Sequence, residues 1–471
     1  MRPWATRTLD AEEDDTMEIT AQHFPDGFVW GVAASAYQIE GAVTEGGRTP
    51  SIWDTFAHTP GKTFDGQTGD VTADHFHRFE EDVELMAELG VTSYRFSISW
   101  SRLMPNGTGD VNPEGLDFYR RLCTALRDRG IEPLATLYHW DLPQVLHDRG
   151  GWADPRSVEW FAEYAVAAKE ALGDLVRVWA TLNEPHCTAF LGYSEGLHAP
   201  GVADPGTAYV VAHHLMLAHH RAIAAMRTTN PHDHDQLGIV LNLIPAWAVD
   251  ASREAGHIAA DADAIHNRLF ASAVLSGEYP DSILRFIDRF GVADRIDTDD
   301  LANAVVPIDF HGVNYYNVNH FGYEQGAPML ADWPGPENGV LARPPGELTE
   351  MGWGVEPVGL TWMLNRVTTW APDLPLYVTE NGAAYPDEVG PDGVVDDQKR
   401  IAYIQQHIAA VKEAIDEGAD VRGYYVWSLL DNFEWAYGFE KRFGLVRVDY
   451  DTLARTPKAS YHWYRDFIAG S

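Results

Sequence analysis

Two apolar segments of the sequence each run directly into a glutamate. One segment is Ala180–Pro185, which contains Glu184, and the other is Tyr377–Gly382, which contains Glu380. Burying a carboxylate costs several kcal/mol unless it is paired, so two such segments in one chain need an explanation. Hydrolysis of a glycosidic bond requires such a pair: one carboxylic acid protonates the leaving oxygen, and one carboxylate meets the positive charge that develops at the anomeric carbon. Either segment alone would equally fit a structural glutamate, ion-paired at the rim of a barrel.

The rest of the chain alternates between two patterns. Short apolar, β-branched or aromatic runs are typical of buried strands, and stretches with apolar residues three and four positions apart are typical of helices. The expected strands are Phe28–Ala36, Ser93–Ser99, Glu132–Tyr138, Val176–Leu182, Gly238–Ile244, Asp309–Tyr316, Leu376–Thr379 and Tyr424–Leu429. The expected helices include Ala73–Leu89, Pro113–Arg129, Ser157–Leu172 and Lys399–Glu417.

This alternation predicts the fold class. About eight strands, each followed by a helix or a long loop, are the pattern of a single α/β (β/α)8 TIM barrel with long βα loops. Strands this apolar suit a parallel sheet that is covered on both faces. A doubly wound open sheet is the alternative, but no GxGxxG or GxxxxGK[ST] loop follows any strand. The active site of such a barrel lies at the carboxyl ends of its strands, where Glu184 and Glu380 are expected.

The composition argues against several kinds of partner. Asp and Glu number 70 against 34 Lys and Arg, which gives a formal net charge of −36. A surface this acidic repels nucleic acid and anionic membranes, so we expect neither as a partner. No apolar run of about 18 residues occurs, so we expect no membrane-spanning helix. One hypothesis for the charge is a high-salt source, where counterions screen the self-repulsion; the alternative is an acidic but ordinary mesophilic protein.

Cysteine usage and the N-terminal residues indicate a compartment and a domain plan. The chain has two cysteines, Cys123 and Cys187, too few for a disulfide framework. This favours a cytoplasmic protein, and the first residues lack the pattern of a signal peptide. Residues 1–16 show no apolar periodicity and are expected to form a flexible tail, so residues 17–471 would form one (β/α)8 domain. The sequence leaves open whether the chain forms a homo-oligomer.

Four blocks of sequence carry a resemblance to a known family. In chain order they are Phe28–Ala42, Thr181–Pro185, Val378–Gly382 and Trp427–Gly438. They resemble the N-terminal signature, the acid/base motif, the nucleophile motif and the sugar-binding loop of glycoside hydrolase family 1, the β-glucosidases and their relatives. The resemblance covers nearly the whole chain. It implies the (β/α)8 barrel and a retaining mechanism that uses neither a cofactor nor a metal.

The resemblance implies roles for the two glutamates. Glu380 would attack the anomeric carbon as the nucleophile and must be ionised, with Arg95 at the end of the second strand lowering its pKa. Tyr316 would hydrogen-bond Glu380 and release it as the covalent bond forms. Glu184 would begin protonated because the nearby negative charge raises its pKa, and it would become the base once that charge is lost. The carboxyl groups of such a pair lie roughly 5 Å apart.

The resemblance also implies a sugar-binding set at the ends of the strands. Asn183 and Asn314 would bind around the sugar 2-hydroxyl. The other hydroxyls and the sugar ring would be bound by Gln38, His139, Trp140, Tyr316, Trp427, Glu434 and Trp435. Taken alone, each of these residues could serve the core instead, as a backbone-bonded histidine or plain barrel packing. Their placement just past strand ends, together with the motifs, favours the binding interpretation.

Single residues separate the chain from branches of the family. Plant myrosinases have glutamine at the acid/base position, so Glu184 implies an O-glycoside substrate. The 6-phosphoglycosidases lack the glutamate and tryptophan of the binding loop, and Glu434 would repel a phosphate. A non-catalytic binding protein is disfavoured because both glutamates are present. His186 stands where bacterial members often have tryptophan, and we expect it at the mouth of the pocket, where it makes the aglycone side more polar.

Other conspicuous residues are expected to be structural. Four histidines of one expected helix, at spacings of five to seven residues, lack the i, i+4 spacing of a zinc-binding HExxH motif, so no metal is expected there. They are His213, His214, His219 and His220. Cys187, three residues after Glu184, could line the pocket, but nothing near it indicates an activated thiolate.

The sequence therefore predicts an exo-acting, retaining β-glucosidase of carbohydrate metabolism and cellulose degradation. It would hydrolyse short, cellobiose-like β-linked sugars and aryl or alkyl β-glucosides by double displacement. The alternative is a β-galactosidase or β-fucosidase with the same machinery, and a remote alternative is a non-catalytic sugar-binding protein. The sugar preference, the natural aglycone and the balance between hydrolysis and transfer do not follow from the sequence.

Overall fold

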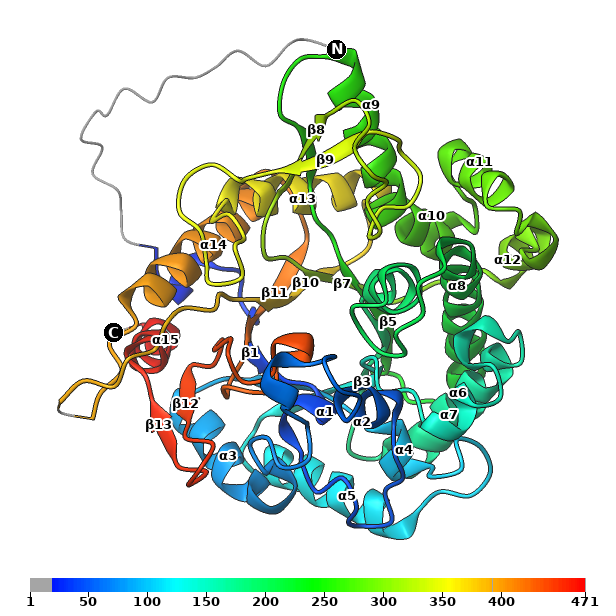
Figure 1. The fold of residues 1–471 in the computed structure, drawn as a ribbon. Helices are drawn as coiled ribbons and strands as arrows, with labels where there is room; N and C mark the ends of the chain where they lie inside the picture. Colours follow the sequence, from blue (N-terminus) through cyan, green and yellow to red (C-terminus); the bar gives the residue numbers. More distant parts are fainter. Residues whose placement is uncertain (1–18, 392, 471) are drawn as a thin grey trace, which may run out of the picture.

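The computed structural model describes residues 19–391 and 393–470. Across these residues, eight parallel strands close a barrel in the order β1-β11-β10-β7-β5-β4-β3-β2, with helices arranged around it (Figure 1). The strands are β1 Val29–Ala33, β2 Ser93–Ser97, β3 Glu132–Tyr138, β4 Val178–Asn183, β5 Gln236–Asn242, β7 Phe310–Asn314, β10 Leu376–Asn381 and β11 Val421–Trp427. This closure confirms the predicted (β/α)8 barrel and excludes the doubly wound open sheet. The tail expected over residues 1–16 lies outside the described residues.

The helices begin and end at residue types that favour helix termini. Asn112 caps the first turn of α5 and is followed by Pro113, whose missing N–H costs nothing at that position. Gly90 ends α3 with a φ of 80°, a conformation that glycine adopts without strain. The helices are α1 Ala36–Ile39, α2 Ile52–Ala57, α3 His75–Leu89, α4 Trp100–Leu103, α5 Pro113–Asp128, α6 Gln144–His147, α7 Ser157–Leu172, α8 Pro205–Thr228, α9 Arg253–Asp263, α10 Leu269–Ser276, α11 Asp281–Arg289, α12 Thr298–Ala304, α13 Pro357–Trp370, α14 Gln398–Asp416 and α15 Ala459–Ala469.

All eight expected strands are present, with shifted boundaries. The first strand ends at Ala33 rather than Ala36 because Ala36–Ile39 turns into the short helix α1. The strand expected over Leu376–Thr379 extends to Asn381, so Glu380 lies within β10 instead of just after it. Glu184 does follow its strand directly. The predicted carboxylate positions are therefore confirmed to within one residue of a strand end.

Long βα loops cover the carboxyl end of the barrel, as predicted. The loops after β5 and β7 contribute a three-stranded sheet in the order β6-β8-β9, formed by Ala246–Ala248, Asn319–Tyr323 and Gly339–Ala342. The loop after β11 contributes the hairpin of β12 Val446–Val448 and β13 Arg455–Pro457. Directly after Glu184, residues Cys187–Glu195 form a π-helical segment. These insertions supply the walls of the site described below.

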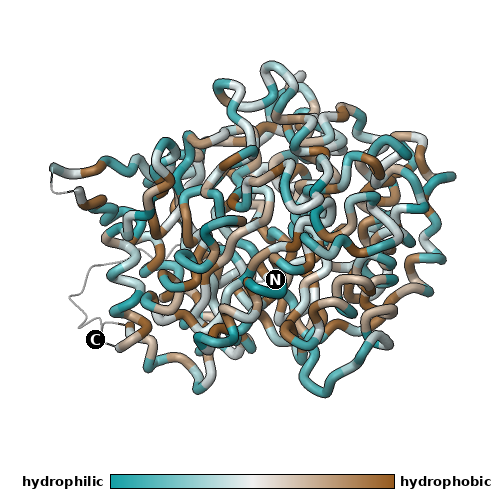
Figure 2. Tube along the Cα trace, turned by 90° about the horizontal axis from the view of Figure 1, so that it is seen from below, coloured by the Kyte–Doolittle hydropathy of each residue, from teal (hydrophilic) through white to brown (hydrophobic). Residues whose placement is uncertain are grey.

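Hydrophilic residues mark many of the outer loops of the molecule, in keeping with the strongly acidic composition (Figure 2). None of the helices in residues 19–391 and 393–470 combines the length and the apolar character that crossing a bilayer requires.

Candidate active site

Strand register aligns polar side chains at the carboxyl end of the barrel. Glu380 on β10 pairs with Asn314 on β7, and Asn314 in turn pairs with Asn242 on β5. The backbone N–H of Glu184 donates to the carbonyl of Val240 on β5. Because neighbouring parallel strands end at one edge, these side chains face one shared space. The register thus brings Glu184 and Glu380 to the same site from distant parts of the chain.

Glu380 is held by a cation and a phenol. The Arg95 guanidinium forms an ion pair with Oε1, and the Tyr316 hydroxyl donates to Oε2 over 2.7 Å. Arg95 lies in the middle of β2, not at its end as predicted, and its long side chain reaches the carboxyl end through the barrel interior. Glu380 is 3% exposed, and a buried carboxyl group requires partners of this kind because water no longer solvates it.

Glu184 has a different environment. Its carboxyl accepts from the Asn314 amide, 2.7 Å from Oε1, and from the Cys187 thiol, 3.3 Å from Oε2. Both donors are neutral. Burial, and then the negative charge of Glu380, raise the pKa of Glu184 to about 8. The site therefore holds one carboxylate with a cationic partner and one carboxyl that favours the protonated form near neutral pH.

Asn183 connects the two glutamates. Its Oδ1 accepts from Arg95 over 2.5 Å and from Asn314 over 3.0 Å. One oxygen therefore accepts from the partner of Glu380 and from the partner of Glu184. Its Nδ2 lies 3.1 Å from Nε2 of His139. Asn314 is fixed further by the Thr379 hydroxyl, which donates to Oδ1 over 2.7 Å. The network sets the relative orientation of the two carboxyl groups.

Three residues of the site have a strained backbone conformation. Ten non-glycine residues within the described ranges have a positive φ, and three of them line this pocket: Glu184 at 46°, Trp140 at 77° and Trp435 at 51°. A side chain disfavours this region because Cβ approaches the backbone, at a cost of about 1–3 kcal/mol each. The surrounding fold holds these residues in place, as is common where a side chain must be aimed precisely at a ligand.

The residues surround a cavity of about 270 Å³. Of the predicted site residues, nine line it: His139, Trp140, Glu184, Asn314, Tyr316, Glu380, Trp427, Glu434 and Trp435. The other three, Gln38, Asn183 and Arg95, hydrogen-bond to lining residues. The structure thus brings the whole predicted set together, either as the cavity wall or in direct contact with it.

The predicted sugar-binding loop forms part of the cavity wall. Gln38 Nε2 donates to Asn432, to the Phe433 carbonyl and, over 3.4 Å, to Glu434. Burial, followed by the charges of the two other glutamates, raises the pKa of Glu434 to about 8. The Trp435 ring packs 4.6 Å from that of Trp140. The loop therefore presents polar groups and aromatic faces together, as recognition of a sugar requires.

A buried ionic cluster anchors this loop from behind. Lys458, immediately before α15, contacts Asp431 of the loop over 2.7 Å and also Asp387. Asp387 in turn accepts from Arg400 of α14. Charges buried this completely are stable only when paired, so the cluster fixes the loop to the two C-terminal helices.

The Trp140 indole N–H donates to the backbone carbonyl of Asn183 over 3.0 Å. The position of His186 differs from the prediction. His186 lies in the cavity wall and is 2% exposed, not at the mouth. The centroid of its ring lies 3.9 Å from that of His266, and the ring also packs against Phe190, contacts that draw it inwards.

The sequence interpretation missed part of the cavity wall. Trp333 and Trp353 come from the long loops after β7, and Asn242 and His266 come from the end of β5 and the helical segment behind it. Asn242 could have been found, because it ends a strand in the same way as Asn183 and Asn314. The two tryptophans lie in loops without a strand pattern, so their position depends on tertiary packing. Cys187, which was weighed as a pocket residue, does line the cavity, and burial raises the pKa of its thiol.

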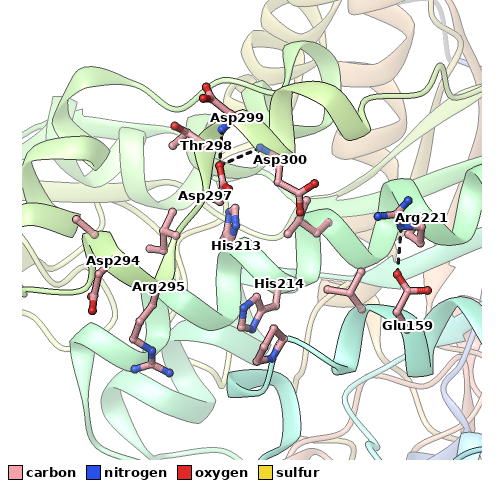
Figure 3. A pocket seen from close by; sticks show the side chains of 15 residues that line it. Glu159, His213, His214, Arg221, Asp294, Arg295, Asp297, Thr298, Asp299 and Asp300 are labelled. Carbon is pink, nitrogen blue, oxygen red and sulfur yellow. Dashed lines mark hydrogen bonds and ion pairs between the residues drawn. The ribbon is translucent and has the colours of Figure 1, made fainter.

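A second hollow, of about 530 Å³, lies between α7, α8 and α12 (Figure 3). Some of its polar groups pair locally: the Asp297 carboxyl accepts from backbone N–H groups in the first turn of α12, and Glu159 pairs with Arg221. The four histidines of α8 bond to separate neighbours: His213 to the Tyr279 hydroxyl, His214 to the Trp152 carbonyl, His219 to the Thr181 hydroxyl and His220 to the Ala273 carbonyl. These bonds explain the histidines as parts of the core.

Comparison with known proteins agrees with this geometry. The sequence profile of glycosyl hydrolase family 1 matches residues 20–471. The chain is 43% identical to beta-glucosidase A of Acetivibrio thermocellus, covering 94% of this chain and 98% of that protein. It is 45% identical to a bifunctional beta-D-glucosidase/beta-D-fucosidase of Bifidobacterium breve, covering 95% and 98%. The structure of a Thermotoga maritima beta-glucosidase in complex with glucoimidazole superposes with a TM-score of 0.90 at 42% identity, covering 95% and 98%.

The profile match spans nearly all of the chain, and identities above 40% extend over almost the full length of these relatives. The chain therefore belongs to glycosyl hydrolase family 1, a family of retaining O-glycosyl hydrolases.

Proposed function

We propose that this protein is a retaining exo-β-glucosidase that releases glucose from short β-linked oligosaccharides and from aryl or alkyl β-glucosides. The observation that carries the proposal is the contrast between two buried carboxyl groups in one cavity. Glu380 is paired with a guanidinium and a phenol, whereas Glu184 has neutral donors and a raised pKa. Environments that push two carboxyl pKa values apart assign one group as nucleophile and the other as acid.

The first step transfers the sugar to Glu380. The Glu380 carboxylate attacks the anomeric carbon and forms an ester bond, while the bond from that carbon to the leaving oxygen breaks. Glu184 gives its proton to the leaving oxygen, so the aglycone departs as a neutral alcohol. Tyr316 and Arg95 hold the attacking carboxylate in line until the ester forms.

The second step uses the same groups in reverse. Burial is the larger cause of the raised pKa of Glu184, and formation of the ester removes the second cause, the charge of Glu380, and so lowers this pKa. Glu184, which gave up its proton in the first step, takes a proton from water as that water attacks the anomeric carbon. The ester bond breaks, Glu380 leaves as a carboxylate, and glucose is released with its original anomeric configuration.

The shape of the cavity supports exo action. At about 270 Å³ it is small for a ligand site, and the loop of Glu434 and Trp435 forms part of its wall. A cavity of this size suits one terminal sugar better than the middle of a polymer. A β-galactosidase or β-fucosidase with the same machinery is the second candidate, and the bifunctional relative from Bifidobacterium breve supports the fucoside.

Hydrolysis of three chromogenic substrates tests the function. We expect release of p-nitrophenol from the β-glucoside, with the β-fucoside and β-galactoside ranking below it. Glucose should be the product from cellobiose, and its initial anomer, followed by NMR, should be β. Turnover of the galactoside or the fucoside above the glucoside would select the second candidate. Absence of turnover of all three by folded protein would favour a non-catalytic sugar-binding protein.

We propose further that the acidic surface is an adaptation to high salt. The 36 uncompensated negative charges repel one another in dilute buffer, and this repulsion weakens as the Debye length falls from about 30 Å at 0.01 M to about 3 Å at 1 M salt. The melting temperature should therefore rise between dilute buffer and molar KCl. A melting temperature that does not rise would leave an acidic but ordinary mesophilic protein.

We also propose that residues 17–471 form a single catalytic domain that uses neither a cofactor nor a metal. We expect the protein to be located in the cytoplasm. Both cysteines of the chain are buried and free, as is usual for a reducing compartment.

A further inference from the structure

Cys187 touches the proposed acid/base, although the mechanism above gives it no role. It begins the π-helical segment that follows Glu184, and its backbone N–H donates to the Glu184 carbonyl over 2.9 Å. This tight turn places Sγ 3.3 Å from Oε2 of the Glu184 carboxyl. The backbone turn and the hydrogen bond of the thiol therefore both hold the sulfur against an oxygen that takes part in the proposed reaction.

The two oxygens of Glu184 have different partners. Oε1 accepts from the Asn314 amide over 2.7 Å, and that amide also contacts Asn183, so its direction is fixed. The hydroxyl oxygen of a carboxylic acid is a poor acceptor, so the transferable proton belongs on Oε2. Oε2 is the oxygen that the thiol contacts. A thiol that donates there stabilises the ionised carboxylate more than the acid, because the charged oxygen is the better acceptor.

The other ionisable groups of the cavity act on Glu184 from a distance. Those on the surrounding elements are Arg95 of β2, His139 after β3, His186, His198, His266, Tyr316 after β7, Asp332, Glu380 of β10, Glu434 and Tyr437. Across the described residues, the recorded hydrogen bonds to the Glu184 carboxyl come from Asn314 and Cys187. Replacing Cys187 therefore removes one direct donor and leaves the charges in place.

The sulfur has a second polar neighbour. The amide nitrogen of Asn242 donates to Sγ over 3.5 Å. The Trp333 indole N–H donates to Nδ1 of His266 over 3.3 Å, so Nε2 of that ring carries the proton and makes no hydrogen bond with the Asn242 amide nitrogen 3.2 Å away. The contact from Asn242 helps to hold the sulfur beside Oε2.

We propose that Cys187 is a positioning residue for the acid/base: its thiol lies against Oε2 of Glu184, donates to that oxygen once the carboxyl is ionised, and so sets the pH at which the carboxyl changes from acid to base. The inference rests on the proposed role of Glu184. It assigns no covalent chemistry to the sulfur, whose buried thiol is a poor nucleophile.

The test compares Cys187→Ala with Cys187→Ser. In the alanine variant we expect the alkaline limb of kcat/KM for p-nitrophenyl β-glucoside to move to higher pH by about 0.5–1 unit, because the ionised form loses a donor. Serine supplies a hydroxyl donor of similar size, so it should return the limb to the wild-type position. The matched control is Cys123→Ala, which removes the other buried cysteine, in α5, and should leave the limb unchanged.

A purely structural role gives a different result. A cavity left by the thiol would lower kcat by a similar factor at every pH and would not move the limb, and that outcome would overturn the proposal. So would a limb that moves equally in the alanine and serine variants. The Glu184 carboxyl can also be titrated by ¹³C NMR, with its signal assigned by the absence of that signal from Glu184→Gln. This titration shows without substrate turnover whether the thiol changes the pKa of the carboxyl. If no glycoside is hydrolysed, the proposed function fails, while this titration still decides whether the thiol stabilises the carboxylate.

Discussion

Glu380→Ala is expected to reduce hydrolysis of p-nitrophenyl β-glucoside by roughly 10⁴-fold or more, as removal of a covalent nucleophile generally does. The variant keeps Glu184, Arg95 and the sugar-binding loop, so a sugar should still bind. What it lacks is the carboxylate that replaces the leaving group on the anomeric carbon. Steady-state kinetics beside the wild-type protein, with folding checked by a melting curve, measure the loss.

Azide separates a missing nucleophile from a damaged site. In the space left by the carboxylate, azide can attack the anomeric carbon while Glu184 protonates the leaving oxygen. The expected product is the α-glucosyl azide, whose configuration is inverted because a single displacement has occurred. Glu388→Ala, an exposed glutamate in the loop after β10, is the matched control and should retain wild-type turnover. A Glu380→Ala protein that hydrolyses the glucoside at near wild-type rate would contradict the assignment of the nucleophile.

The barrel and both glutamates could be predicted because they depend on local pattern. Each strand is a short apolar run, and a parallel strand buried on both faces tolerates few polar residues before its end. A glutamate directly after such a run is therefore conspicuous in the sequence, as at Glu184. The same reasoning applies to Asn183 and Asn314, which end β4 and β7. Asn242 ends β5 in the same way and could have been included.

The remaining parts of the site depend on contacts that no local pattern contains. Arg95 was expected at a strand end, yet it reaches Glu380 from the middle of β2 because a long side chain can extend along the barrel interior. His186 was expected at the mouth, but its contacts with His266 and Phe190 draw it into the wall. Trp333 and Trp353 come from loops whose path is set by the rest of the fold. In each case the outcome depends on which side chains meet across elements.

The surrounding fold stabilises a site that contains strained backbone and buried like charges. Glu184, Trp140 and Trp435 have left-handed backbone conformations, and three glutamates share one buried cavity. Like charges this close favour protonation, which is the state that the acid needs but not the nucleophile. Arg95 resolves the conflict because its ion pair is made with Glu380, while the bonds recorded for Glu184 come from neutral donors. The position of one cation thus assigns different roles to two chemically identical side chains.

Glu184→Ala is expected to separate substrates by their leaving groups. Cellobiose releases an alcohol that needs a proton, so its kcat/KM should fall by about 10²–10⁴-fold, the usual contribution of general acid catalysis. The 2,4-dinitrophenyl β-glucoside releases a stable phenolate and should show little loss in kcat/KM. Its kcat should still fall, because the second step loses the base that activates water.

The pH profile gives an independent readout of the same variant. Burial and the charge of Glu380 raise the pKa of Glu184 to about 8, so the acid form is present below that pH and is lost as the pH rises through it. Wild-type kcat/KM for cellobiose should therefore have an alkaline limb near pH 8, and this limb should be absent from the residual activity of Glu184→Ala. Glu195→Ala, which removes another carboxyl from the end of the same π-helical segment, should keep the limb. Equal losses for cellobiose and the dinitrophenyl glucoside, with the limb retained, would mean that another group donates the proton.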